Sequence, residues 1–336
     1  MTQTIKIAIP MAGLGTRIRP HTWSKPKPLI ALAGKTVLDH VLAQFNTLPD
    51  PQSVEYIFII SPQGDQLRAH MEEHHPEKKV HYVVQAEMKG QSDALYLARQ
   101  HLQGPTLMAF SDTLIEIDLS FIKDESADGV ACVKAVEDPR RFGVAEVDGD
   151  GRVTRLVEKP QDVTNNLAVV GFYYFRSGEK LIAAIEEQKQ RQITLHNEYY
   201  LADAINIMLE KGSRFRTEKI ETWLDAGTPE AVLETNRHLL GSGYDNSQQA
   251  SRRAGVSVVP PVFIHEESRI ENAVVGPYVS IGKSCQVSNS VIRNSIIEDF
   301  CHIDQMVLED SLVGQNVRLQ GQATRFNVGD DSWIMQ

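Results

Sequence analysis

Short apolar runs alternate with longer amphipathic stretches over roughly the first 240 positions of the 336-residue chain. Each run is bounded by polar or turn-forming residues, which predicts a buried β-strand. Segments near 36–47, 64–75 and 91–102 have the apolar spacing of amphipathic helices. Strands alternating with helices predict a doubly wound, mostly parallel α/β sheet. The predicted strands are Ile5–Pro10, Tyr56–Ser61, Val80–Gln85, Thr106–Phe110 and Gly129–Val136.

A hairpin and further helices are predicted in the second half of this region. Apolar residues at Val144–Val147 and Val153–Val157 flank a tetrapeptide, Asp148-Gly149-Asp150-Gly151, that is typical of a tight turn. The predicted helices that follow lie near 177–191, 197–211 and 228–240.

The pattern changes after residue 240. The stretch 241–255 is polar and rich in small residues, so it predicts a linker between a domain at 1–240 and a second domain at 256–336. In the second domain aliphatic residues recur every five or six positions, 5.5 on average over ten intervals. Such a recurrence favours a β-solenoid over the alternative, a small antiparallel β-sandwich. The recurring positions are Ile264, Ile270, Val275, Ile281, Val287, Ile292, Ile297, Ile303, Leu308, Val313 and Leu319.

Composition narrows the class of protein. The chain has 34 basic and 44 acidic residues, and the net charge of −10 argues against general binding to nucleic acid or to an anionic membrane. Cys132, Cys285 and Cys301 have neither disulfide-framework nor zinc-site spacing, so we expect reduced thiols. The N-terminal apolar run is interrupted by Lys6 and is too short for a membrane span or signal segment. We therefore expect a soluble, cytoplasmic protein.

The first predicted strand leads into a glycine loop with cations behind it, Ala12-Gly13-Leu14-Gly15-Thr16-Arg17 and then Lys25-Pro26-Lys27-Pro28. Glycines let backbone N–H groups approach phosphate oxygens, and Arg and Lys neutralise them. The loop lacks the Gly-Lys-Ser/Thr of a P-loop, and Ile18 stands where the dinucleotide fingerprint has its third glycine. The alternative to a polyphosphate site is a plain tight turn after a strand.

Candidate metal ligands and a further cation follow other predicted strands. Asp112 comes after Thr106–Phe110, at the carboxyl end of a strand, where a doubly wound sheet binds its ligands. Asp225 follows a second short apolar run and precedes a helix, and Glu158-Lys159-Pro160 ends the hairpin. Taken singly, each aspartate also fits a turn or helix-cap position, and the lysine a solvated surface charge.

Taken together, these segments resemble the signature of the sugar-1-phosphate nucleotidylyltransferases, also called nucleotide-sugar pyrophosphorylases. The resemblance spans residues 5 to about 240 and implies the Rossmann-like nucleotidyltransferase fold. Several branches of that family carry a left-handed parallel β-helix at the C-terminus, which is similar to the repeat found here. Family-like segments in chain order are the glycine loop, Gln85 with Gly90-Gln91-Ser92-Asp93-Ala94, Phe110-Ser111-Asp112, Phe142-Gly143-Val144, Glu158-Lys159-Pro160, Val170-Gly171, Glu198 with Asp203, and Trp223 to Gly227.

The resemblance assigns roles on the nucleotide side of the site. It implies that Arg17 grips the β- and γ-phosphates and stabilises departing pyrophosphate, with Lys27 assisting, and that Asp112 and Asp225 hold the catalytic Mg²⁺ against the α-phosphate. The residues implied in nucleotide binding are Ala12, Gly13, Gly15, Thr16, Gln85 and Gly90, the last two at the edge of the base.

The resemblance also implies a second side of the site, for the sugar phosphate. It places Gly143, Glu158, Lys159 and Gly171 there, with Lys159 pairing with the attacking phosphate. The implied reaction converts a nucleoside triphosphate and a sugar 1-phosphate into a nucleotide sugar and pyrophosphate by in-line attack on the α-phosphorus. The overall pattern is most similar to thymidylyltransferases acting on glucose 1-phosphate.

Other functions stay open from the sequence. Guanylyl transfer to mannose 1-phosphate and uridylyl transfer use the same chemistry, and relatives without activity serve as regulatory subunits. A bifunctional enzyme with an acyltransferase β-helix is a further alternative, with His265 and His302 as its available bases. We instead expect the β-helix to serve packing or homo-oligomer formation.

Overall fold

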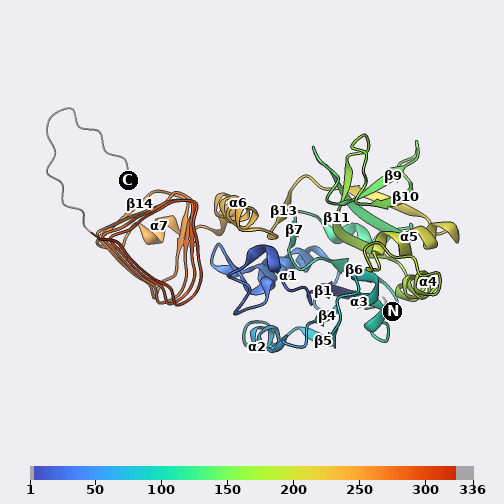
Figure 1. The fold of residues 1–336 in the computed structure, drawn as a ribbon, viewed down its shortest axis with the longest axis horizontal. Helices are drawn as coiled ribbons and strands as arrows, with labels where there is room; N and C mark the ends of the chain where they lie inside the picture. The colour runs from blue at the N-terminus through green and yellow to red at the C-terminus, as the bar shows by residue number, and fades with distance from the viewer. Residues whose placement is uncertain (1–3, 323–336) are drawn as a thin grey trace. The chain divides into compact units, whose positions relative to one another are not determined.

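The computed structural model describes residues 4–322, and the chain forms two compact units (Figure 1). The first unit runs to Ile30 and continues from Thr36 to Ala231. The second unit comprises Ala31–Lys35 and the chain from Val232 onward.

The division falls inside helix α6 (Pro229–Leu239), upstream of the expected linker at 241–255. That segment contributes a short helix, α7 (Ser247–Ala250), whose N-flanking residue Asn246 hydrogen-bonds to the backbone of Ile264. In the expected range 256–336, residues 323–336 lie outside the described part of the chain.

A nine-stranded sheet organises the first unit. Four neighbouring strands, in the order β6-β1-β4-β5, are all parallel, as the sequence predicts. The rest of the sheet is mixed, because β11 runs antiparallel to β6, β8 and β9. Its strands are β1 (Lys6–Pro10), β4 (Glu55–Ile60), β5 (Lys79–Val84), β6 (Thr106–Ala109), β8 (Gly129–Ala135), β9 (Gly143–Val147), β10 (Val153–Glu158), β11 (Leu167–Phe175) and β12 (Phe215–Lys219).

Helices cover both faces of this sheet (Figure 1). Along β4, alternate side chains point to opposite faces, and both sets are buried under helices. Ile57 and Ile59 join the core beneath one set of helices, whereas Tyr56 and Phe58 point to the other face. On that other face the ring of Phe45, just after α1, stacks on Phe172 with 5.8 Å between centroids. The helices are α1 (Val37–Ala43) and α2 (Asp65–His74) on one face, and α3 (Gln91–Leu97), α4 (Gly178–Gln190) and α5 (Leu201–Glu210) on the other.

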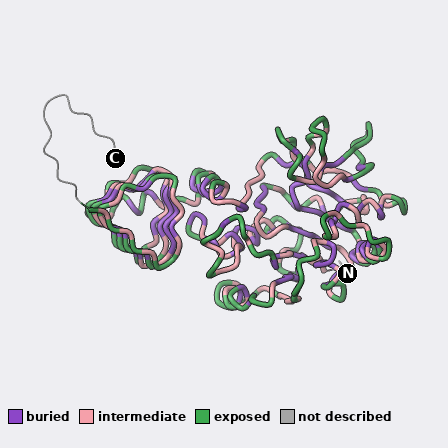
Figure 2. The backbone as a smooth tube through the Cα atoms, in the orientation of Figure 1, coloured by how far each residue is buried: buried purple, intermediate pink, exposed green. Residues whose placement is uncertain are grey.

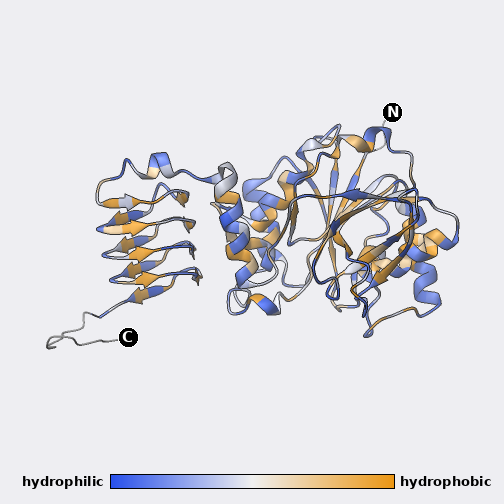
Figure 3. Ribbon diagram, turned by 90° about the horizontal axis from the view of Figure 1, so that it is seen from above, coloured by the Kyte–Doolittle hydropathy of each residue, from blue (hydrophilic) through white to orange (hydrophobic). Residues whose placement is uncertain are grey.

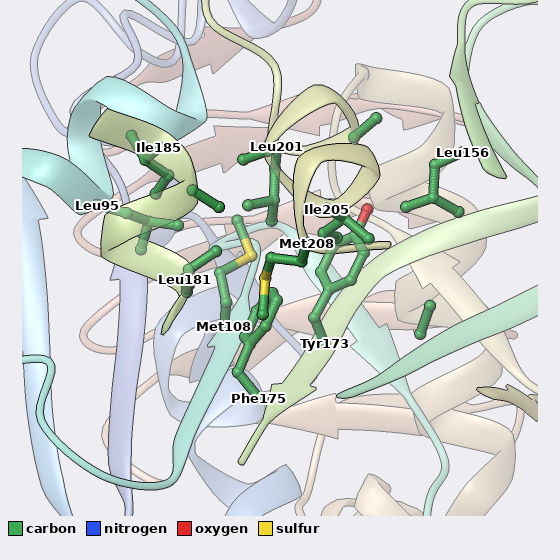
Figure 4. Close-up of a cluster of buried hydrophobic side chains, with 14 of the residues drawn as sticks. Leu95, Met108, Leu156, Tyr173, Phe175, Leu181, Ile185, Leu201, Ile205 and Met208 are labelled. Carbon is green, nitrogen blue, oxygen red and sulfur yellow. The ribbon is translucent and has the colours of Figure 1, made fainter. Parts of the chain in front are cut away.

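The core under α3, α4 and α5 is built from side chains that are almost wholly buried (Figure 4). Leucine and isoleucine side chains of the helices pack against Met108 of β6 and Tyr173 and Phe175 of β11. Close packing of this kind fixes the helices on the sheet and so fixes the strand ends, where the loops of the candidate site begin.

The second unit contains a parallel β-helix, seen as stacked coils in Figure 3. Three parallel sheets form its faces, in agreement with the predicted left-handed β-helix. One coil takes 16 or 17 residues, as the register partners Val262–Val279 and Ile296–Leu312 show, which matches three aliphatic intervals. The faces are β14 (Val256–Val258), β17 (Ala273–Val275), β20 (Val291–Ile292) and β23 (Val307–Leu308); β15 (Val262–Ile264), β18 (Val279–Ile281), β21 (Ile296–Ile297) and β24 (Leu312–Val313); and β16 (Arg269–Glu271), β19 (Gln286–Ser288), β22 (His302–Asp304) and β25 (Arg318–Gln320).

The coils of the β-helix repeat a buried inner row of side chains and sharp corners between the strands (Figure 2). Nearly all the recurring aliphatic side chains of the sequence are buried in one core, with Cys285 and Cys301 among them as free thiols. The backbone turns through the left-handed region between strands, a conformation that asparagine and aspartate tolerate better than most residues. The corner residues with positive φ are Asn272, Tyr278, Ser284, Asn289, Asn294, Phe300, Gln305, Asp310 and Asn316.

Over residues 4–322, the helices are all too short or too polar to cross a bilayer.

Candidate active site

The loops predicted to carry chemistry all begin at one edge of the parallel strands. β1, β5 and β6 end at Pro10, Val84 and Ala109, and their parallel pairing through β4 brings these ends to the same edge. The backbone continues the ladder for one more step there, since Met11 N donates to Ile59 O at 2.8 Å and Gln85 N donates to Ile60 O at 2.9 Å. The glycine loop, Gln85 and Asp112 therefore follow neighbouring strand ends.

The glycine loop presents backbone to solvent at the end of β1. Gly13 is exposed, and a Cβ built there meets no atom within 4 Å, whereas Ala12 just before it is buried. The turn is closed by Thr22, whose hydroxyl donates to Gly15 O at 2.7 Å, and a short 3₁₀ helix at Thr16–Ile18 follows. This geometry leaves N–H groups of the loop open to an anion.

Two aspartates and two cations meet beside this loop. β7 (Thr113–Ile115) and β13 (Trp223–Asp225) pair antiparallel, with Asp225 opposite Thr113, and Ala226 N donates to Asp112 O at 2.9 Å. The ribbon thus holds Asp112 and Asp225 next to each other. The ammonium of Lys27 forms an ion pair with Asp112. Arg17 is exposed and close enough for its charge to act on Asp225.

The pKa of Asp225 reports on this cluster. Burial raises the pKa of its carboxyl above the ordinary value, and the negative charge of Asp112 raises it further, while Lys27 and Arg17 oppose the shift. Two carboxylates in a partly desolvated place repel each other unless a cation lies between or beside them. The four side chains are therefore an arrangement of the kind that holds a divalent cation and phosphate oxygens.

Gln85 and Gly90 lie together on the β5 side of the site. The side chain of Gln85 is buried, and its Nε2 donates to Gly90 O and to Asp93 Oδ2, both at 3.3 Å. Because both partners are acceptors, the amide is oriented with its nitrogen toward them. Gly90 has φ +94°, and a Cβ there would lie 2.5 Å from Tyr199 O, so only glycine fits.

Gly143, Glu158 and Lys159 come together at the base of the β9–β10 hairpin. Gly143 and Glu158 are register partners, and a Cβ on the glycine would lie 3.1 Å from Glu158 Oε2. Lys159 Nζ donates to the hydroxyl of Tyr200 at 2.7 Å and lies 4.8 Å from the centroid of its ring. The lysine is thereby held beside the N-terminal end of α5.

Glu158 is electrostatically the most unusual group on this side. Burial raises the pKa of its carboxyl to about 7, and the nearby negative charges of Asp203 and Glu198 add to the rise, while Lys159 opposes it. A carboxyl that titrates near neutral pH can either donate or accept a hydrogen bond, which suits a group facing sugar hydroxyls.

Gly171 has a structural reason to be glycine. Its φ is +73°, a Cβ there would overlap the ring of Phe110 at 2.2 Å, and its carbonyl accepts from Phe110 N at 3.0 Å. This close approach of β11 to the end of β6 positions the Phe110-Ser111-Asp112 segment. The backbone geometry alone explains why residue 171 is glycine, and its predicted place on the sugar-phosphate side stays a prediction.

Contacts across the sequence join the three parts of the site. The rings of Phe142 and Trp223 pack edge to face with centroids 4.9 Å apart, which links the hairpin to the strand that ends in Asp225. Ser92 Oγ donates to Tyr200 O at 3.1 Å, which links the segment after Gly90 to the residue that holds Lys159.

Three residues in these contacts were not singled out from the sequence: Tyr200, Asp93 as a partner of Gln85, and Lys189 of α4, which pairs with Asp93. Tyr200 is 41 residues from Lys159 and Lys189 is 96 residues from Asp93, so no local pattern reveals either contact. The available signal for Asp93 was an acidic residue in the family-like segment Gly90-Gln91-Ser92-Asp93-Ala94, at the start of a predicted helix.

A family model described as nucleotidyl transferase matches residues 8–242 of the chain. The chain belongs to the nucleotidyl transferase family. The match contains every residue of the candidate site, from Ala12 to Asp225.

Similar proteins extend the likeness beyond that region. The bifunctional protein GlmU of Methanocaldococcus jannaschii is 28% identical, and the match covers 91% of this chain and 76% of that protein. The glucose-1-phosphate thymidylyltransferase of Streptomyces antibioticus is 27% identical over 98% of this chain and 99% of that protein. A solved UDP-glucose pyrophosphorylase complexed with UDP-glucose shares the fold, with a TM-score of 0.61 and 20% identity over 71% of this chain and 100% of that one.

Proposed function

We propose that this nucleotidyl transferase joins a nucleoside triphosphate to a sugar 1-phosphate and releases pyrophosphate. The observation that carries the proposal is the cluster of Arg17, Lys27, Asp112 and Asp225 beside an open glycine loop. Nucleotidyl transfer by direct attack needs positioned cations and metal ligands rather than a side-chain nucleophile, and the cluster supplies these groups.

The carboxylates of the cluster fit Mg²⁺. Asp112 and Asp225 offer hard oxygen ligands at one end of the β7–β13 ribbon, and the pKa of Asp225 is raised by burial and then by the charge of Asp112, a repulsion that a divalent cation relieves. When bound, Mg²⁺ neutralises the α-phosphate and the charge that develops on it. Arg17 and Lys27 then act on the departing pyrophosphate, and the exposed backbone of Gly13 contacts the phosphates together with Gly15 and Thr16.

Lys159 is assigned to the attacking phosphate. Its ammonium is held by Tyr200, and that hydrogen bond raises the pKa of Lys159, so the group stays charged at neutral pH. Gly143 leaves room above the backbone for the carboxyl of Glu158, which we assign to a sugar hydroxyl. Lys159 would then bind the phosphate of the sugar 1-phosphate and Glu158 its sugar, so that the substrate is held at both ends.

The orientation of Gln85 bears on the base. Since its Nε2 is occupied by Gly90 O and Asp93, its Oε1 is the atom free to meet a nucleobase, and it accepts from a ring N–H. Thymine, uracil and guanine carry such a donor, whereas adenine and cytosine do not. This supports a thymidylyl, uridylyl or guanylyl donor.

Among these donors we propose dTTP, with glucose 1-phosphate as acceptor. The nearly full-length match to a glucose-1-phosphate thymidylyltransferase supports this choice. UTP is the second candidate, favoured by the fold shared with UDP-glucose pyrophosphorylase, and GTP with mannose 1-phosphate is the third.

A substrate panel tests the proposal. Pyrophosphate release with Mg²⁺ is measured for dTTP, UTP, GTP, ATP and CTP against glucose, mannose, galactose and N-acetylglucosamine 1-phosphates. We expect the largest kcat/KM for dTTP with glucose 1-phosphate and negligible rates for ATP and CTP. Turnover with ATP above all others would contradict the role of Gln85, and no turnover with any pair would favour a non-catalytic protein.

A further inference from the structure

Outside the candidate active site, three side chains converge at the junction of α1 and α2. Asp39 stands in the first turn of α1, His70 in the second half of α2, and His75 at the cap that ends α2. His70 Nε2 lies 2.8 Å and His75 Nε2 lies 2.7 Å from the same atom, Asp39 Oδ1. The candidate ligand atoms all lie within 4.8 Å of one another. We infer that Asp39, His70 and His75 form a binding site for a late first-row divalent metal ion of the Zn²⁺ type.

The donor set suits such an ion. Imidazole nitrogens and a carboxylate oxygen are the preferred ligands of Zn²⁺, and two histidines with one carboxylate are a recurrent set of three. Both imidazoles present Nε2, and both are aimed at one oxygen, so a small outward movement of the rings would admit an ion among the three atoms. A solvent molecule would supply the fourth ligand, because the site reaches the surface.

Burial distinguishes these residues from ordinary surface histidines. The side chains of His70, Asp39 and His75 are only 11%, 16% and 20% exposed. Their neighbour His74 on the same helix is 53% exposed, and although its ring lies 4.6 Å from that of His70, its Nε2 faces Glu73 and not Asp39. Asp39 and the two histidines are therefore fixed by packing in a common direction.

The carboxylate is held in place by its own helix. Asp39 Oδ2 accepts from Thr36 N and from Thr36 Oγ1, both at 2.8 Å, and Thr36 Oγ1 in turn accepts from Asp39 N. This capping box leaves Oδ1 as the oxygen that faces the histidines. Hydrogen bonds to the outer oxygen of a ligating carboxylate orient it for the metal.

The site would join two helices on one face of the sheet. It links Asp39 in the first turn of α1 to His70 in the second half of α2 and to His75, which caps the C-terminal end of that helix. Metal bound there would hold α2 against α1 and stabilise the folded chain, because the ligands come together only in the native state. No residue is shared with the cluster of Asp112 and Asp225.

Metal titration of the full-length, tag-free protein tests the inference. After dialysis against a chelator, the protein is titrated with Zn²⁺ by calorimetry and with Co²⁺ by visible absorption, which reports the coordination geometry. We expect one saturable site per chain, a Co²⁺ spectrum typical of mixed nitrogen and oxygen ligation, and a rise in Tm with added Zn²⁺.

Matched variants decide which residues hold the metal. His70→Gln and His75→Gln should each weaken Zn²⁺ binding by about hundredfold or more, whereas His74→Gln, which removes a ring packed on His70 but no ligand atom, should weaken it far less. Asp39→Asn keeps an oxygen for the capping box and serves as a fold-preserving variant, with weaker metal binding and unchanged circular dichroism. No saturable site in the parent protein, full binding in Asp39→Asn, or equal loss in His74→Gln would overturn the inference.

Discussion

At the residue scale, Glu158 shows most clearly how the environment of a side chain makes the stability of the protein depend on pH. In the unfolded chain its carboxyl ionises near its ordinary pKa of 4.5, but in the folded protein it stays protonated until about pH 7. Between these values the folded state binds the extra proton, so the contribution of this group to stability is complete below pH 4.5 and is lost as the pH rises through 7. The sign is opposite to that of a salt-bridged carboxylate.

Glu158→Gln tests this shift. As the pH rises from 5 to 8, the parent protein should lose on the order of 3 kcal/mol of unfolding free energy relative to the variant, which cannot titrate there. A pKa shift of one unit corresponds to about 1.4 kcal/mol. Urea unfolding of both proteins at several pH values measures the difference, and other titrating groups cancel in it. A difference that does not change with pH would show that Glu158 titrates normally.

Lys159 should affect one substrate more than the other. Lys159→Ala removes the ammonium that Tyr200 holds, so the KM for the sugar 1-phosphate should rise about tenfold to a hundredfold, as expected for a charged hydrogen bond. The KM for the nucleotide should change little. Tyr200→Phe, which keeps the ring and the lysine, should give a smaller rise of the same kind. An equal rise in KM for both substrates would contradict the assignment of Lys159 to the sugar 1-phosphate.

Residue positions were predictable from sequence only where a local signal exists. Asp112 could be placed at a strand end because an apolar run precedes it, and the structure has β6 ending three residues earlier. The orientation of Gln85 could not be predicted, because it depends on Asp93 and, through it, on Lys189 in another helix. Side-chain partners of this kind follow from the tertiary fold and not from spacing.

At the element scale, the five strands predicted before the hairpin were placed to within one residue at every end. β4 begins at Glu55 where Tyr56 was expected, and β8 ends at Ala135 where Val136 was expected. Runs of β-branched and aromatic residues with polar boundaries explain this success. The longest strand, β11, was not predicted as a strand, because Gly171 interrupts its apolar run. Since β11 runs antiparallel to its neighbour β6, the part of the sheet beyond β6 is mixed.

Gly171 offers a test of how β11 positions the site. Gly171→Ala forces a side chain into a left-handed backbone conformation and against the ring of Phe110, so we expect a loss of at least about 2 kcal/mol of unfolding free energy. Gly151→Ala, in the hairpin turn at φ +76° with no atom within 4 Å of the built Cβ, is the matched control and should cost less, because it carries the backbone strain without the overlap. Urea unfolding gives both values. Equal stability of the two variants would mean that the approach of β11 to Phe110 is not required.

At the scale of the whole molecule, the repeat after residue 255 was predictable because every coil must place aliphatic residues inward. In the structure, Val274, Val291 and Val307 are register partners along one face, and Val307 is 79% exposed. We propose that this face serves homo-oligomer formation through Val307, an exposed apolar side chain in line with two partly buried valines, since exposed apolar surface marks contact sites.

Val307→Asp should therefore shift the assembly toward smaller species. Sedimentation velocity or light scattering of the full-length protein measures the change. Val147→Asp, which places the same charge at an exposed valine of the β9–β10 hairpin, should leave the assembly unchanged. A parent protein that is monomeric, or an oligomer that survives Val307→Asp, would contradict this role for the face.

The most direct test of the account is Mg²⁺-dependent pyrophosphate release by Asp112→Asn and Asp225→Asn. Each variant loses a proposed metal ligand and keeps its side-chain volume, so kcat should fall by about a hundredfold or more while the circular dichroism spectrum is preserved. Asp118→Asn, at a helix cap away from the cluster, is the control and should keep parent activity. Parent-like turnover in both Asp112→Asn and Asp225→Asn would contradict the claim that this cluster performs nucleotidyl transfer.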